Sequence, residues 1–423
     1  MSGKAGQMGP QMEMLEDRRM LSTTVTYTPT SITIVGDTTK TGQISVTGNP
    51  GGNYLVGVVG ETPVVKGTPP AVSDTVSITV KGGDAGRTII VTPNHAKNVT
   101  INGGKGNDTI TAGSNVFAGN VTINGGDGAN TLTVTGVDIV GKVTMTGGNG
   151  ADTIRIDAAT GINGTTTINT GDGVNSVTLG NARTGGKLTI YGGKDADTVS
   201  FGNANGTQLL GNVSIDTKGG DDNVTVGRGT YGATPVGKSP TAFALKTGEG
   251  NDTVLIGGVI AVGAVVFAGN FSLDTGAGDD TLGIAATFAA GTVDFEKAST
   301  ILMGAGNDRV IIASGANGNN VLFIGGTTID LGASSESGVG DRFDVSATGT
   351  SQLALGSKNT LNLGSGIKDL TTGIRAGSIY LNTLTQTDIK AAKGAIISSA
   401  LRVAILKGLD ASAAGVKLTI SLA

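Results

Sequence analysis

One short phrase recurs through the middle of the chain at an almost constant interval. It reads GGKGNDTI at 103–110, GGDGANTL at 125–132, GGNGADTI at 147–154, TGDGVNSV at 170–177 and GGKDADTV at 192–199. The Asp or Asn before the Thr or Ser serves as a marker, and successive markers are Asp108, Asn130, Asp152, Asn175 and Asp197. A spacing of 22 or 23 residues is typical of repeat proteins, in which each copy packs on the next.

The phrase continues toward the C-terminus with a longer period. Four further copies, TKGGDDNV, TGEGNDTV, TGAGDDTL and MGAGNDRV, place the marker at Asp222, Asp252, Asp280 and Asp308, which are 25 to 30 residues apart. A weaker early copy, GGDAGRTI, occupies 82–89. The repeat therefore extends over most of the chain and loosens along it.

The segments on either side of each glycine turn alternate apolar and polar residues, which is the periodicity of β-strands. Val99 to Ile101 lies before one turn and Thr109 to Thr111 after it, and a third apolar pair such as Val116 and Phe117 supplies another wall. A single copy has unpaired edges, so the copies must stack at ~4.8 Å. We predict an all-β fold, a right-handed parallel β-helix (solenoid) with coils of about 22 residues that lengthen to 25–30 residues. A propeller would need blades of roughly 40 residues, and collagen would need glycine at every third position.

Composition agrees with a packed repeat and excludes several classes of function. The chain has 73 glycines, but 38% of its residues are hydrophobic, enough to fill a core. The net charge is only −4 with both signs interspersed, so we expect no nucleic-acid partner. The absence of cysteine excludes disulfides, thiolate metal sites and a cysteine nucleophile. No apolar run approaches the ~20 residues of a transmembrane segment.

The turns carry the residues best suited to bind a metal ion. Glycine supplies positive φ angles, and Asp oxygens suit a hard cation such as calcium. Every marker from Asp222 onward is acidic, and Asp279 adds a carboxylate beside Asp280. The candidate calcium ligands are Asp252, Asp279, Asp280 and Asp308, and no other cofactor is expected.

A metal-free interpretation of the same turns stays open. Asp and Asn side chains commonly accept hydrogen bonds from their own turn and cap it. Between residues 108 and 197 the markers alternate between Asp and Asn, which halves the charge of the stack. The turn also resembles half of the nonapeptide GGxGxDxUx of the repeats-in-toxin family. That resemblance implies calcium shared between facing turns, although this chain has one such turn per coil rather than one every nine residues.

Parallel β-helices also include pectate lyases and polygalacturonases, so catalytic residues must be sought. Such sites group carboxylates with Arg or Lys on one outer face, whereas the outward positions here are mostly Thr, Ser and Asn. The lone histidine, His95, stands at a coil junction without an acid nearby in the sequence. Single charges that form no constellation are Arg155, Asp157, Arg228 and Arg309. We predict no catalytic residues and no enzyme activity.

The two ends of the chain depart from the repeat. Residues 15–21, LEDRRML, resemble a short tag near the N-terminus of exported surface proteins of planctomycete bacteria, although Asp17 and Met20 differ from the usual residues. The resemblance implies an extracellular or cell-surface location.

The predicted organisation has four parts. They are a flexible leader at 1–30, an N-terminal cap with the first coils at 31–95, the glycine-rich solenoid at 96–365 and a C-terminal cap or assembly segment at 366–423. Residues 387–409 read either as an amphipathic helix or as two strands, and 418–422 as a strand.

The functional prediction follows from shape and surface. A rod with a threonine-rich face suits an extracellular structural or adhesive protein, with a fibre or filament subunit as one form. Self-association, head to tail or lateral, and contact with cell-envelope components or polysaccharide are the expected partnerships. The alternative is a β-helix that binds or cleaves polysaccharide.

Overall fold

The structure is a computed structural model of the 423-residue chain. It describes residues 22–345 except 49–50, 114, 158–159, 203–205, 233–240, 258–263, 286–290, 313–319 and 334–340. It also describes four short strands at 352–355, 359–362, 379–381 and 418–421. The predicted tag at 15–21 and the ambiguous segment 387–409 lie outside these residues.

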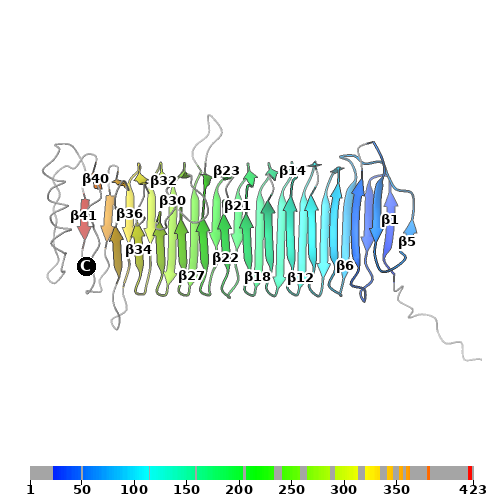
Figure 1. The fold of residues 1–423 in the computed structure, drawn as a ribbon, viewed down its shortest axis with the longest axis horizontal. Helices are drawn as coiled ribbons and strands as arrows, with labels where there is room; N and C mark the ends of the chain where they lie inside the picture. Colours follow the sequence, from blue (N-terminus) through cyan, green and yellow to red (C-terminus); the bar gives the residue numbers. More distant parts are fainter. Residues whose placement is uncertain are drawn as a thin grey trace, which may run out of the picture.

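The described chain is entirely β and winds into a rod with three walls (Figure 1). Each coil adds one strand to a 16-stranded sheet (sheet 1), one to a 13-stranded sheet (sheet 2) and one to a 12-stranded sheet (sheet 3). From β6 onward all neighbouring strands within a sheet are parallel, as between β9, β12 and β15. The predicted parallel β-solenoid is confirmed.

The strands of sheet 1 are β1 (Thr24–Thr28), β2 (Ser31–Val35), β5 (Val64–Lys66), β6 (Ser77–Gly83), β9 (Val99–Gly104), β12 (Val121–Asp127), β15 (Val143–Asn149), β18 (Thr166–Asp172), β21 (Leu188–Tyr191), β24 (Val213–Asp216), β27 (Phe243–Glu249), β30 (Phe271–Ala277), β33 (Ser299–Leu302), β36 (Thr327–Asp330), β39 (Asn359–Asn362) and β41 (Leu418–Ser421). Those of sheet 2 are β3 (Gln43–Gly48), β4 (Tyr54–Val58), β7 (Thr88–Pro93), β10 (Thr109–Gly113), β13 (Thr131–Thr135), β16 (Thr153–Asp157), β19 (Ser176–Leu179), β22 (Thr198–Phe201), β25 (Asn223–Val226), β28 (Thr253–Ile256), β31 (Thr281–Ile284), β34 (Arg309–Ile312) and β37 (Arg342–Val345). Those of sheet 3 are β8 (His95–Ala96), β11 (Val116–Phe117), β14 (Asp138–Ile139), β17 (Gly161–Ile162), β20 (Arg183–Thr184), β23 (Thr207–Leu209), β26 (Gly229–Tyr231), β29 (Val265–Phe267), β32 (Thr292–Phe295), β35 (Asn320–Phe323), β38 (Gln352–Leu355) and β40 (Ile379–Leu381).

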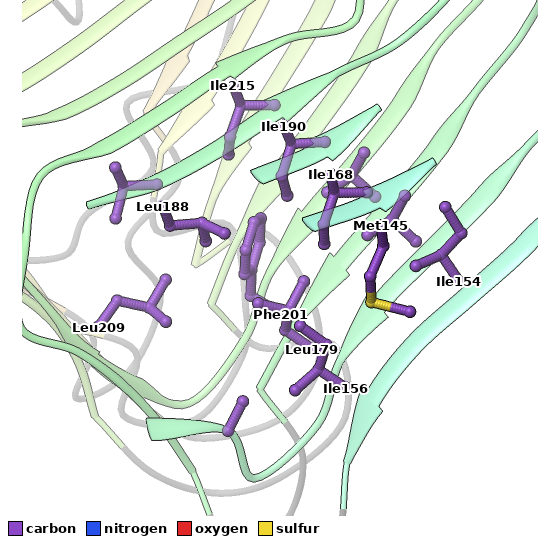
Figure 2. Packing of buried hydrophobic residues seen from close by; sticks show 14 of the residues in the cluster. Met145, Ile154, Ile156, Ile168, Leu179, Leu188, Ile190, Phe201, Leu209 and Ile215 are labelled. Carbon is purple, nitrogen blue, oxygen red and sulfur yellow. The ribbon is translucent and has the colours of Figure 1, made fainter. Parts of the chain in front are cut away.

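Residues in equivalent positions of successive coils stack directly on one another. In sheet 1, Ile101 pairs with Ile123 and Ile123 with Met145, and all three are fully buried. Because strand side chains alternate between the two sides of a sheet, every second residue enters the core. Figure 2 shows such side chains, including Met145, Ile168 and Ile190, converging inside the coils. A continuous apolar column therefore runs the length of the rod.

The N-terminal end is closed by two antiparallel hairpins. Strand β1 pairs with β2 and β3 with β4, and β5 and β4 are the outermost strands of sheets 1 and 2. The leader had been expected to reach residue 30, but β1 already begins at Thr24, because the alternation in TVTYT buries Val25 against the first coil. At the other end the expected strand at 418–422 is present as β41.

Candidate functional site

The markers of successive coils form one continuous buried column, here called the marker ladder. None of its members is more than 7% exposed. Its members are Arg87, Asp108, Asn130, Asp152, Asn175, Asp197, Asp222, Asp252, Asp280, Asp308 and Asp341. The repeated phrase does not predict Arg87 and Asp341 as markers, because the first is a cation and the second comes 33 residues after Asp308.

Every step of the marker ladder is joined by the same hydrogen bond. The backbone N–H of each member donates to the side-chain Oδ1 of the member in the next coil, over 2.6 to 3.0 Å. The side chains were expected to accept hydrogen bonds from their own turn, but the bond to Oδ1 comes from the preceding coil. Since the coils stack in register, the amide of the preceding coil points at the carboxylate, and each side chain ties two coils together.

The second side-chain atom distinguishes Asn from Asp. Asn130 Nδ2 donates to the carbonyl oxygens of Gly126 and Gly128 at 3.4 and 3.1 Å. Asn175 Nδ2 does the same to Gly171 and Gly173 at 3.2 and 2.6 Å. Here the side chain does cap its own turn.

The hydroxyls of Thr217, Thr247 and Thr275 lie beside the carboxyl groups of Asp222, Asp252 and Asp280 and favour their ionised form, which lowers their pKa. Most aspartates of the marker ladder nevertheless have a buried Oδ2 without a hydrogen bond of normal geometry to the described residues. They are Asp108, Asp152, Asp222, Asp252, Asp280, Asp308 and Asp341. Asp197 differs, because its Oδ2 accepts the N–H of Gly193 at 3.1 Å. The marker ladder thus holds buried carboxyl oxygens whose hydrogen bonding is incomplete.

Burial raises the pKa of these carboxyl groups, since the charged form loses water. The pKa rises to about 6 for Asp108 and Asp152, against the opposing hydrogen bond from the preceding amide. It rises to about 7 for Asp222 and about 6 for Asp280. Asp308 rises furthest, to about 8, because burial is joined by the negative charges of Asp280, Asp341 and Asp279.

A buried arginine occupies the N-terminal end of the marker ladder. The Arg87 guanidinium lies 3.2 Å from Glu61 Oε1 and donates to the backbone oxygen of Asp37 at 2.8 Å. Glu61 is held in turn by the N–H and hydroxyl of Thr23. The first coil therefore ends the column with a paired cation, beside Asp108.

A second, exposed ladder runs along the outer edge of the same turns. The N–H of Asn251 donates to Asp221 Oδ1, that of Asp279 to Asn251 Oδ1 and that of Asn307 to Asp279 Oδ1, at 2.7 to 2.8 Å. Here the amide of the later coil donates to the earlier side chain, opposite to the marker ladder. In these turns, hydrogen bonds between coils therefore form on both the buried and the exposed side.

The four candidate calcium ligands fall in different ladders. Asp252, Asp280 and Asp308 stack in the buried column, whereas Asp279 lies on the exposed edge and is bonded to Asn307. In the part of the chain that the structure describes, no group of three or more His, Cys, Asp or Glu is placed to hold a metal ion. Calcium binding by these residues stays a prediction.

The residues considered for catalysis are dispersed over the rod. His95 does have an acid nearby, contrary to expectation, because Nδ1 lies 2.9 Å from Asp74 Oδ1 in the chain preceding β6. Arg155 pairs with Asp157 on β16 at 3.1 Å, whereas Arg309 begins β34 several coils away. The stacking of coils supplied a partner that distance along the sequence had hidden.

The outward face of sheet 2 carries two columns of hydroxyl groups. One column contains Thr109, Thr131, Thr153, Ser176 and Thr198, which pair in register and are half-buried or exposed. The other contains Thr111, Thr133, Thr178 and Ser200, interrupted by Arg155. The repeat thus produces a regular, largely uncharged surface.

Comparison with protein-family models, with curated proteins and with solved structures finds no match to this chain. Among the described residues, no helix has the length and apolar character needed to span a membrane. The functional argument therefore depends on the geometry of the coils and their faces.

Proposed function

We propose that this protein is an exported rod that acts as a structural or adhesive component of a cell surface. The observation that carries the proposal is the unbroken in-register pairing of all three sheets from β6 to β35. At ~4.8 Å per coil, the stack from β6 to β36 is on the order of 50 Å long. Backbone hydrogen bonds join each coil to the next, and no interdomain linker interrupts the described stack.

The two hydroxyl columns of sheet 2 support the adhesive part of the proposal. A flat face with regularly spaced hydroxyl groups offers many equivalent weak contacts to a repetitive partner such as a polysaccharide. Weak contacts made together reach an avidity that none has alone. The function proposed here needs no catalytic residue.

The test begins with the shape of the purified protein. Negative-stain electron microscopy is expected to show rods, singly or joined end to end or side by side. Compact particles of similar dimensions in every direction would overturn the rod, and cell fractionation that leaves the protein in the cytoplasm would overturn export.

A binding experiment with matched variants tests the sheet 2 face. Thr133→Lys with Thr178→Lys places two cations among its hydroxyls, and Thr122→Lys with Thr144→Lys adds the same charge to sheet 1. Co-sedimentation with insoluble cell-wall polysaccharide is expected to fall severalfold for the sheet 2 variant only. Equal loss in both variants would show that charge, not this face, matters.

A further inference from the structure

One edge of sheet 2 is unpaired at the N-terminal end of the rod. Strand β4 is the outermost strand of this sheet and pairs with β3 alone, in antiparallel register. Each sheet 2 strand from β3 to β34, by contrast, has a neighbour on both sides. The unpaired edge lies at the end of the rod where Figure 1 labels β1 and β5. It is therefore a place where a further strand can add to the sheet.

The register of β4 shows which of its backbone groups are open. The N–H of Val59 donates to Gln43 O at 2.9 Å, so every second residue counted back from Val59 directs its backbone groups toward β3. The residues between them, Tyr54, Val56 and Val58, direct theirs away from β3. Tyr54 already donates at 3.1 Å to a carbonyl oxygen of the segment that follows β5. Among the described residues, the outward N–H and C=O groups of Val56 and Val58 have no strand to pair with.

The edge of β4 lacks the residues that usually protect an open strand. Such edges are commonly kept from pairing by charged side chains, by proline or by being very short. Strand β5, the outermost strand of sheet 1, contains only three residues, ends in Lys66 and begins directly after Pro63. Strand β4 contains five residues, YLVGV, with neither a charge nor a proline. Of these two edges, β4 is the one open to pairing.

The outward side chains of β4 and of the residue after it add an apolar surface to this edge. Leu55 and Val59 are each 62% exposed and lie on the same side of the sheet, with Gly57 between them in the sequence. The Glu61 side chain, two residues further on, is only 6% exposed and is paired with Arg87. Apolar area and open hydrogen-bonding groups thus occur together along one short strand.

The edge of β4 is complementary to a second copy of itself. If Val56 pairs with Val58 of an antiparallel copy, both open residues of each chain form hydrogen bonds and Tyr54 keeps its present acceptor. The same register sets Gly57 opposite Gly57 and Leu55 opposite Val59, at positions where the side chains of facing strands come closest. No like charges meet across the two-fold axis, because β4 has none.

A charged segment fits this edge less well than a second copy does. Residues 1–21 lead into β1 at this end of the rod and lie outside the described residues, and positions 13–19 contain five charged side chains. Paired with β4, that segment would place charges beside Leu55 and Val59, whereas a second copy places apolar side chains there. The second copy is therefore the occupant that the charge pattern favours.

We propose that two rods join at their N-terminal ends through antiparallel pairing of β4 with β4 of a second copy. Sheet 2 then continues from one rod into the other, as it already continues from coil to coil. The dimer is closed, because both copies use the same edge. It is one form of the self-associating rod proposed above, and rods that stay monomeric would overturn the dimer without overturning the rod.

Substitutions on the outward side of β4 test the interface in the full chain. By light scattering at high micromolar concentration, the wild type is expected to have twice the monomer mass. Leu55→Lys with Val59→Lys is expected to have the monomer mass, because like charges then face each other. Val140→Lys with Val174→Lys, at exposed positions of later coils, is the control and is expected to stay dimeric. A monomeric wild type or a dimeric β4 variant would overturn the proposal. A chain that dimerises only after deletion of residues 1–21 would also overturn it, since those residues would then occupy the edge.

Single cysteines test the register without placing charge at the edge. The chain has no cysteine of its own, so an introduced thiol has only an introduced partner. In the proposed pairing the Cα atoms of Leu55 and of Val59 in the facing copy are about 4.5 Å apart, within the range of a disulfide. Mild oxidation of Leu55→Cys mixed with Val59→Cys is expected to give cross-linked dimers in severalfold greater yield than either variant alone. Equal yields in all three samples would contradict this pairing.

Discussion

The N-terminal and C-terminal halves of the rod share the same three-sheet coil but differ in coil length, in their marker residues and in the length of their sheet 3 strands. Between β6 and β23 the coils are short, markers alternate between Asp and Asn up to Asp197, and most sheet 3 strands contain two residues. From β24 to β36 the coils are longer, the markers are all Asp, and the sheet 3 strands contain three or four residues.

The core changes with the width of sheet 3. Its inward column reads Phe117, Ile139, Ile162, Thr184 and Leu209 in the N-terminal half. It continues as Tyr231, Phe267, Phe295 and Phe323, and the ring centroids of the last two are 4.6 Å apart in a stacked arrangement. A longer wall encloses more volume, and aromatic rings fill it. Coil length, core residue and marker chemistry thus vary together.

The largest expected loss of stability comes from a change in the aromatic residues of sheet 3, Tyr231, Phe267, Phe295 and Phe323. Phe295→Ala removes a fully buried ring between Phe267 and Phe323 and should cost about 3 to 5 kcal/mol. Ile139→Val at the equivalent position should cost only about 1 kcal/mol. Because repeat proteins can unfold locally, hydrogen exchange of the β35 and β14 amides is the suitable measurement. Equal losses would show that the aromatic core is not specially required.

The next effect concerns the closed N-terminal end. Arg87→Ala leaves Glu61 buried without its cation and should destabilise the first coils by about 3 kcal/mol. Arg183→Ala, at an exposed position of sheet 3, is the control and should change little. Denaturant unfolding followed by hydrogen exchange of β6 and β7 distinguishes them. A similar small change in both variants would show that the end needs no buried cation.

Replacing an Asn marker of the N-terminal half by the Asp found in the C-terminal half should lower the stability by a smaller amount. Asn130→Asp removes two hydrogen bonds to Gly126 and Gly128 and should cost about 1 to 3 kcal/mol near neutral pH. The loss should shrink in acid, because a protonated carboxyl group can donate where the amide did. Unfolding midpoints against pH measure it, and a loss independent of pH would count against proton donation at this position.

Calcium is expected to have the smallest effect. The prediction names Asp252, Asp279, Asp280 and Asp308, all in the C-terminal half. At a calcium concentration equal to the dissociation constant, stabilisation is about 0.4 kcal/mol. Titration calorimetry should show binding that Asp279→Asn with Asp308→Asn abolishes. No heat from the wild type at millimolar calcium would remove the prediction.

Much of the fold was predictable because its information is local and repeated. The alternation around each glycine turn marks the strands, and the spacing of the markers sets the size of a coil. Positive φ at Gly126 fits the turn, and a side chain there would overlap Gly104 of the preceding coil. The same reasoning located nine of the markers, since each lies within a copy of the repeated phrase.

Other features arose only from the stacking of coils. Each marker carboxylate accepts a hydrogen bond from a backbone amide of the preceding coil. The acid beside His95 is Asp74, which lies 21 residues earlier in the sequence. Arg87 entered the marker ladder because its backbone is in register with Asp108, although its side chain has the opposite charge. Such contacts depend on register between coils, which sequence spacing alone does not supply.

From its sequence alone, the chain is committed to a solenoid, because a period of about 22 residues with two-residue alternation leaves each copy dependent on its neighbours. The tertiary structure decided which side-chain atoms of the markers form hydrogen bonds. An Asp and an Asn are equivalent in the repeated phrase, but in the buried turn the Asn side chain donates to Gly carbonyl oxygens and an ionised Asp side chain has no hydrogen to donate. That difference exists only where water is excluded and the donors of the neighbouring coils are already engaged.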